Sequence, residues 1–195
     1  MAATEDNAAA DSMEADPVAM RRVLVAGSTG AGKTTMARRL AALLDIRFHE
    51  MDALAITGPG WQDNPRLAED VSQISSGASW IFDSLGYPDV RDLLWTRADT
   101  VVWLDYPRPV VMRRVLRRSA ARTLLRRRIF GGNVETLAGW FSADHPAWWA
   151  WSQYANRRAD IAGRCADPRF APLRVVRLAT PREAGDWLAA LRVSR

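Results

Sequence analysis

The sequence predicts an α/β protein of three layers, in which helices cover both faces of a five-stranded parallel sheet. Short apolar segments typical of buried strands alternate with longer segments whose apolar residues recur at helical spacing. Strands joined by helices run parallel within one sheet, since each helix returns the chain to the same edge. A glycine-rich segment also follows the first apolar strand directly, as is typical where a parallel strand passes into a helix.

The 195 residues are enough for one domain with a substantial core. Residues 1–19 are rich in alanine and acidic side chains without an apolar period, so we expect a disordered acidic tail before a domain at 20–195. No apolar run reaches the roughly 18 residues that span a bilayer, and no secretory signal is visible. The single Cys165 cannot form a disulfide within the chain. These observations favour a cytoplasmic protein without a membrane partner.

The first half of the chain predicts three strands and two helices. Each strand is a short apolar segment, and each helix has apolar residues three or four positions apart. Two glycines and two prolines predict a loop at 57–65. In chain order the strands are expected at 22–26, 46–49 and 80–83, and the helices at 36–44 and 67–74.

The second half predicts two more strands, at 100–104 and 173–178, together with three helical segments. The first helix, at 110–125, is rich in arginine and is interrupted by the glycines at 130–133. The second occupies about 144–165. The last begins at the capping box Thr180–Glu183, which has proline at its first helical position.

The glycine-rich segment matches the phosphate-binding pattern G-x-x-x-x-G-K-[ST], known as a P-loop, between an apolar strand and an amphipathic helix. Glycines let backbone N–H groups turn toward phosphate oxygens, and the helix N-terminus adds partial positive charge. Lys33 is expected to reach the β- and γ-phosphates, and Thr34 to hold Mg²⁺. We therefore expect ATP and Mg²⁺ as cofactors, with the nucleotide bound by Gly27, Ser28, Thr29, Gly30, Ala31, Gly32, Lys33, Thr34 and Thr35.

Lys33 is also the only lysine in the chain, although Lys and Arg together number 27. Arginine replaces lysine poorly in this motif, because the site needs a compact ammonium on a flexible stem. Guanine-specific GTPases use an Asn-Lys-x-Asp motif, which a chain without a second lysine cannot contain. The sequence therefore points to the small kinases among P-loop proteins.

Three aspartates follow predicted strands and are expected at the carboxyl edge of the sheet. Asp83 and Asp105 each end an apolar strand, and either could orient Mg²⁺ through water. We favour Asp83 for this role, whereas Asp105 is expected to be partly structural. Asp52, after the second strand, is placed to meet an acceptor hydroxyl or to orient the second substrate, with a solvated loop acid as the alternative.

Eight arginines lie between residues 113 and 128. They could form a solvated face, a clamp on the transferring phosphoryl group, or a track for nucleic acid. Their position before a glycine break favours the clamp, on a mobile lid at about 119–145. We expect Arg118 and Arg127 to belong to this clamp.

These motifs resemble the adenylate-kinase-like P-loop family, in particular the short bacterial DNA topology modulation proteins, which are predicted nucleotide kinases. The resemblance covers about residues 21–192 and implies the three-layer fold of a nucleoside monophosphate kinase with a helical lid. Asp83 resembles the family's Mg-associated aspartate. Arg114 and Arg118 resemble two arginines, one stacking on adenine and one touching phosphate, while Arg157 and Arg158 resemble those that follow the lid.

The sequence differs from this family at two positions. Ser84 stands where the kinases have glycine after the third strand, and Val134 stands where close relatives have a lid arginine. We expect an ATP-dependent kinase acting on a nucleotide-like or small hydroxylated acceptor, as a monomer or homodimer. Its predicted catalytic residues are Lys33, Asp52, Asp83, Arg118, Arg127 and Arg157, with Arg114 at the nucleotide. The alternatives are a nucleic-acid-associated ATPase and a nucleotide-binding regulator without transfer activity.

Overall fold

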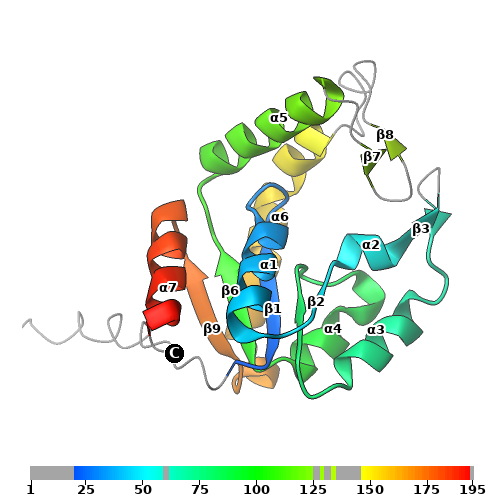
Figure 1. Cartoon of the computed structure of the whole chain (residues 1–195), viewed down its shortest axis with the longest axis vertical. Coiled ribbons are helices and arrows are strands. Elements are labelled where there is room, and N and C mark those ends of the chain that lie inside the picture. The colour runs from blue at the N-terminus through cyan, green and yellow to red at the C-terminus, as the bar shows by residue number, and fades with distance from the viewer. Residues whose placement is uncertain (1–19, 59–61, 125–127, 130–132, 135–145, 194–195) are drawn as a thin grey trace, which may run out of the picture.

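The computed structural model describes residues 20–58, 62–124, 128–129, 133–134 and 146–193. A parallel five-stranded sheet at its centre has the order β2-β5-β1-β6-β9 (Figure 1). The five strands are β1 (Arg22–Gly27), β2 (Phe48–His49), β5 (Trp80–Phe82), β6 (Thr100–Leu104) and β9 (Arg174–Leu178).

Helices connect these strands along the chain. Two short antiparallel pairs lie outside the main sheet, β3 (Ile56–Gly58) with β4 (Gln62–Asp63), and β7 (Arg128–Ile129) with β8 (Asn133–Val134). The helices are α1 (Lys33–Leu44), α2 (Met51–Ala55), α3 (Leu67–Ser75), α4 (Pro88–Arg97), α5 (Arg108–Leu124), α6 (Pro146–Ala166) and α7 (Pro181–Val193), with a 3-10 turn at Pro168–Phe170.

Alternate residues of β1 point to opposite faces of the sheet, so that each face has its own apolar core. Val23 and Val25 join one core with residues of α1 and α7, whereas Leu24 and Ala26 join the other with residues of α3, α4 and α6. All four side chains are fully buried. A parallel strand buried on both faces explains why this segment is apolar throughout.

The three-layer α/β prediction is therefore confirmed, as are the five parallel strands. Three local predictions differ from the structure. The segment predicted as a loop at 57–65 contains β4 and the end of β3, and no helix was predicted at α2 or between 83 and 100, where α4 lies. Its signals were present, since Pro88 occupies the first turn and the buried Val90 and Leu94 are four residues apart.

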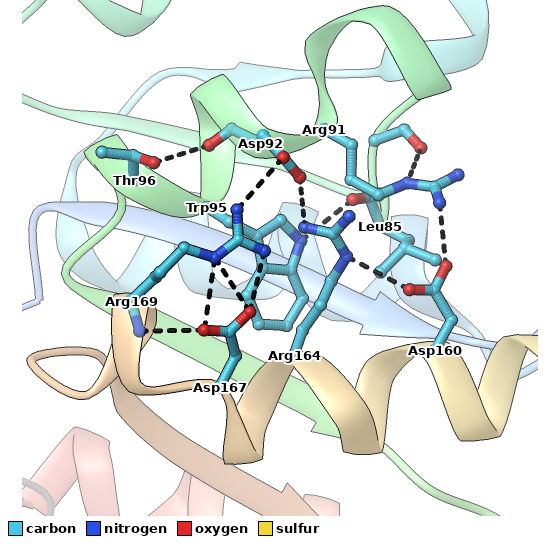
Figure 2. A network of polar contacts seen from close by, with 10 residues as sticks. Leu85, Arg91, Asp92, Trp95, Thr96, Asp160, Arg164, Asp167 and Arg169 are labelled. Atoms are coloured by element: carbon cyan, nitrogen blue, oxygen red, sulfur yellow. Dashed lines mark hydrogen bonds and ion pairs between the residues drawn. The ribbon is translucent and has the colours of Figure 1, made fainter.

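Helix α4 is joined to α6 and the 3-10 turn by alternating arginines and aspartates, as Figure 2 shows. Arg164 of α6 binds Asp160 at 3.1 Å and Asp92 of α4 at 2.7 Å, and its guanidinium lies 5.6 Å from the Trp95 ring. Arg91 of α4 binds Asp160 at 2.8 Å. These contacts determine how α6 lies beside α4 on one face of the sheet.

Helix α5 follows β6 and packs on the loop between β1 and α1. A Cβ added to Gly30 would lie 2.3 Å from Cγ2 of Val115 and 3.2 Å from the Val111 carbonyl. The predicted lid at about 119–145 falls largely outside the described residues, and of it the structure describes the end of α5 and the pair β7–β8. The proposed tail at 1–19 also lies outside them. In the described part of the chain, no helix is long and apolar enough to cross a membrane.

Candidate active site

The loop between β1 and α1 leaves the N-terminus of α1 open. Gly32 is the N-cap of the helix, and no side chain makes a capping hydrogen bond there. The first N–H groups of a helix have no partner within it, so they are available to an anion. Gly30 has φ 89°, a left-handed conformation that favours glycine, and the Ala31 amide donates to the Ser28 carbonyl at 3.1 Å. The backbone therefore has the form of a phosphate cradle.

Arg114 of α5 supports this loop from outside. One terminal nitrogen donates a 2.7 Å hydrogen bond to the Ala31 carbonyl, and the guanidinium lies 5.0 Å from the Tyr106 ring centroid. A Cβ on Gly32 would lie 3.3 Å from the same nitrogen. The geometry thus gives Arg114 a role in holding the loop, and its predicted contact with the nucleotide stays a prediction.

Lys33 lies where several charged side chains converge. Its Nζ donates to the Ser28 carbonyl at 3.3 Å. Its pKa is lowered from 10.5 to about 8, mainly by burial and also by the nearby charges of Arg157 and Arg118, whereas the charges of Asp52 and Asp83 partly offset this shift. Charged side chains of α2, α5, α6 and the end of β5 thus act on one ammonium group of α1. A site with this much positive charge is suited to binding phosphates.

Asp83 connects the end of β5 to the P-loop helix. The Thr34 hydroxyl donates a short hydrogen bond to Oδ2 of Asp83, and the Met51 amide donates to Oδ1 at 3.0 Å. Burial raises the pKa of Asp83, although the hydrogen bonds from Thr34 and Met51 and the charge of Lys33 oppose this rise. The two predicted metal-associated residues, Thr34 and Asp83, therefore lie in direct contact.

Asp105 makes different contacts, although it also follows a buried strand. Its carboxylate binds Arg158 of α6 at 2.6 Å and Arg177 of β9 at 2.6 Å, and its side chain is 3% exposed. Burial raises its pKa, but the two arginines outweigh this effect and hold the pKa below the usual range. The expectation of a structural role for Asp105 fits these contacts, and its carboxylate is committed to α6 and β9.

Asp52 and Arg157 are two of the charged residues that act on Lys33. Asp52 is exposed in the first turn of α2, in a helix and not a loop, and accepts a hydrogen bond from the Tyr87 hydroxyl at 3.3 Å. Burial lowers the pKa of Arg157, as does the charge of Arg91, whereas Asp52, Tyr87 and Asp160 oppose this shift. Tyr87 therefore contacts Asp52 and interacts electrostatically with Arg157, and sequence analysis did not identify it.

Solved structures with a similar fold include small-molecule kinases. A shikimate kinase from Acinetobacter baumannii, solved in complex with shikimate, superposes with a TM-score of 0.53 at 16% identity, over 88% of this chain and 90% of that one. A gluconokinase from Sinorhizobium meliloti 1021 gives 0.48 at 16% identity over 90% and 95%. A shikimate kinase from Bacteroides thetaiotaomicron gives 0.49 at 15% identity over 90% and 98%. This chain has the fold of a P-loop kinase.

A family model described as "ATPase family associated with various cellular activities (AAA)" matches residues 23–85. The matched part extends from β1 to just beyond β5, less than half of the chain, and includes both the P-loop and Asp83. It supports a P-loop nucleotide-binding domain. The sequence identities to the solved kinases are below 25%, so these structures show the fold of this chain and do not identify its substrate.

The P-loop kinase fold thus brings together most of the predicted catalytic residues. The charges of four of them act on Lys33 of the P-loop, namely those of Asp52, Asp83, Arg118 and Arg157. Arg127 lies outside the described residues. Arg158 differs from its neighbour Arg157, because it binds Asp105. Tyr87 and Arg91 were missed because no element had been predicted there, although the Gly86-Tyr87-Pro88 sequence is a turn signal.

Proposed function

We propose that this protein is an ATP-dependent kinase that transfers the γ-phosphoryl group to a nucleotide-like or small hydroxylated acceptor. The observation that carries the proposal is the convergence on Lys33 of Arg157 and Arg118 with the carboxylates of Asp52 and Asp83. Phosphoryl transfer needs positive charge around the transferring group and acidic groups for the metal and the acceptor. Both kinds of group come from different elements that the fold brings to one edge of the sheet.

The residues on the P-loop side are suited to bind ATP with Mg²⁺. Backbone N–H groups of residues 27–35 would surround the phosphates, and Lys33 would contact the β- and γ-phosphates. Thr34 and Asp83, which lie in contact, would supply oxygen ligands of the kind that Mg²⁺ prefers, Thr34 directly and Asp83 through water. In the described ranges no group of three or more acidic, histidine or cysteine side chains could hold a metal alone. The cation would therefore depend on phosphate oxygens and water for its other ligands.

The residues on the opposite side are suited to the acceptor. Asp52 is exposed and near both Lys33 and Arg157, so it can accept a proton or a hydrogen bond from an acceptor hydroxyl. In the transfer, the acceptor oxygen bonds to the γ-phosphorus as the bond to the bridging oxygen of ADP breaks, and Asp52 receives the hydroxyl proton. Arg157 and Arg118 would offset the charge that develops on the phosphoryl oxygens.

The arrangement of α5 favours a clamp over a nucleic-acid track for the inward arginines. Arg114 donates to the P-loop and Arg118 affects Lys33, and both are partly buried. Arg113 and Arg117 are exposed on the same helix. Arg117 and Arg118 therefore make a matched pair for mutation, because both are arginines of α5 but only Arg118 is partly buried.

A screen of nucleoside monophosphates and hydroxylated metabolites, with ADP formation and product mass as readouts, tests the proposal. Arg118→Gln should lower transfer by about 10²-fold, as expected for a charge acting on the transferring group, whereas Arg117→Gln should keep it. Lys33→Ala should abolish it. Absence of ADP formation with every acceptor would overturn the proposal. It would also be overturned if nucleic acid stimulated ATP hydrolysis and the Arg117→Gln variant lost this stimulation.

A further inference from the structure

The segment between β5 and α4 is held by hydrogen bonds at successive residues. The Ser84 hydroxyl accepts a bond from the Gly86 amide at 2.9 Å, and the buried Leu85 carbonyl accepts one from the Trp95 indole at 3.0 Å. Gly86 has φ 99°, and a Cβ there would lie 2.7 Å from the backbone of α4. These contacts leave Tyr87, the next residue, little freedom of position.

Arg91 connects this segment to α6. Its Nε donates to the Gly86 carbonyl at 3.1 Å. Its NH1 binds Asp160 at 2.8 Å, as the right side of Figure 2 shows. Asp160 lies about one turn after Arg157 on α6. Arg91 therefore sets the spacing between Tyr87 and Arg157, which lie on different elements of the candidate site.

The Tyr87 side chain extends from this fixed point toward α2. Its backbone is extended (φ −65°, ψ 154°), as the following Pro88 favours. Its hydroxyl donates to Oδ1 of Asp52 at 3.3 Å across 35 residues of sequence. We propose that Tyr87 is a positioning residue that orients the Asp52 carboxylate toward the acceptor hydroxyl, an inference that rests on the proposed kinase function.

The ionisation of Tyr87 supports a donor role. Its pKa is raised to about 12, mainly by burial and also by the charge and hydrogen bond of Asp52 and the charge of Asp63 of β4, whereas Arg157 partly offsets this shift. The phenol is therefore protonated near neutral pH and acts as a hydrogen-bond donor and not as a base. A separation of 3.3 Å is long for such a bond, and catalytic hydrogen bonds commonly shorten when substrate binds.

Exposed Asp52 needs such a partner, because α2 is only five residues long and an exposed carboxylate can rotate freely. Asp52 lies in α2, before β5 in the chain, and Tyr87 lies directly before α4, after β5. Their contact therefore also connects α2, on the proposed acceptor side, to the start of α4. Tyr87 engages Oδ1, and within the described residues no hydrogen bond to Oδ2 is found, so that Oδ2 would be available to the acceptor hydroxyl.

Tyr87→Phe removes the hydroxyl and keeps the ring, so it tests the proposal directly. We expect kcat to fall about tenfold, as for loss of one hydrogen bond to a charged group, with the KM for ATP changed less than about twofold. Tyr154→Phe is the matched control, because that hydroxyl donates to the Tyr106 carbonyl at 2.9 Å and has no contact with Asp52. This variant should keep the wild-type kcat.

A double-mutant cycle with Asp52→Asn provides a readout that does not depend on activity. The loss of thermal midpoint from Tyr87→Phe should be smaller when Asp52 is already asparagine, because the charged acceptor is then absent. An active enzyme whose Tyr87→Phe variant keeps full kcat, or additive midpoint losses in the cycle, would overturn the positioning role. A wild-type protein that shows the coupling and phosphorylates no acceptor would instead overturn the proposed function and retain the Tyr87–Asp52 contact.

Discussion

Thr34, in the first turn of the P-loop helix, donates its hydroxyl hydrogen bond to Asp83, which lies 49 residues later at the end of a neighbouring strand. β5 pairs directly with β1, so the parallel register brings the carboxyl ends of both strands to the same edge. The contact therefore depends on strand order, and it joins the two residues that we propose as metal-associated. The same edge carries Lys33, which lies in the first turn of the same helix as Thr34.

Thr34→Val removes the hydroxyl while keeping the side-chain volume. If Thr34 holds Mg²⁺, transfer should fall by about 10²-fold and require more Mg²⁺ for half-maximal rate, whereas nucleotide binding without Mg²⁺ should change little. The measurement is a Mg²⁺ titration of ADP formation beside Mg²⁺-free calorimetry. Thr96→Val, an exposed threonine of α4, should behave as wild type. An unchanged Mg²⁺ requirement in Thr34→Val would contradict the assignment.

The pKa of about 8 at Lys33 predicts how stability and nucleotide binding depend on pH. Because burial and Arg157 lower this pKa below 10.5, the folded protein releases the proton first as pH rises. Stability should therefore increase between about pH 8 and 10.5 relative to Lys33→Met. Nucleotide affinity should fall over the same range, since phosphates bind the charged ammonium. Parallel affinity profiles for wild type and Lys33→Met between pH 7 and 9.5 would exclude this linkage.

Gly30→Ala should destabilise the P-loop, because the new Cβ would lie 2.3 Å from Val115 at a residue with φ 89°. We expect a loss of about 1–3 kcal/mol in the free energy of unfolding, measured by urea titration. Gly163→Ala is the control, since it lies in α6 with open space around its Cβ. It should stabilise the protein by about 0.5–1 kcal/mol. A neutral Gly30→Ala would mean that α5 does not press on the loop in solution.

Asp105→Asn should lower the free energy of unfolding by about 1–3 kcal/mol at neutral pH, because the hydrogen bonds from Arg158 and Arg177 lose their charged acceptor. The folded-state pKa of Asp105 lies below the usual 3.8, so its stabilisation is present above that value and is lost as pH falls through the folded pKa. In urea titrations the free energies of unfolding of the two proteins should therefore differ at pH 7 and become similar at acid pH. Asp186→Asn, an exposed residue 3.7 Å from Arg182, should cost less than about 0.5 kcal/mol. Equal losses in both variants would rule out a special role for Asp105.

The sequence by itself determined the fold class and the P-loop. Strand and helix periodicities, together with Gly27–Thr34 between a strand and a helix, are local patterns, and local patterns can be recognised without knowing the fold. They located each strand of the main sheet and placed Asp83 and Asp105 after their strands. Helix α4 was not predicted, although Pro88 is a local helix-start signal.

Tertiary structure decided which of the similar residues belong to the site. Asp83 and Asp105 each follow a buried strand. Asp83 follows β5, the strand beside β1, and accepts a hydrogen bond from Thr34 of α1, whereas Asp105 binds arginines of α6 and β9. Adjacent Arg157 and Arg158 diverge in the same way, because neighbouring residues on a helix point in different directions. The pairing of Tyr87 with Asp52 joins residues far apart in the chain, so only the packed arrangement of α2, α4 and α6 could reveal it.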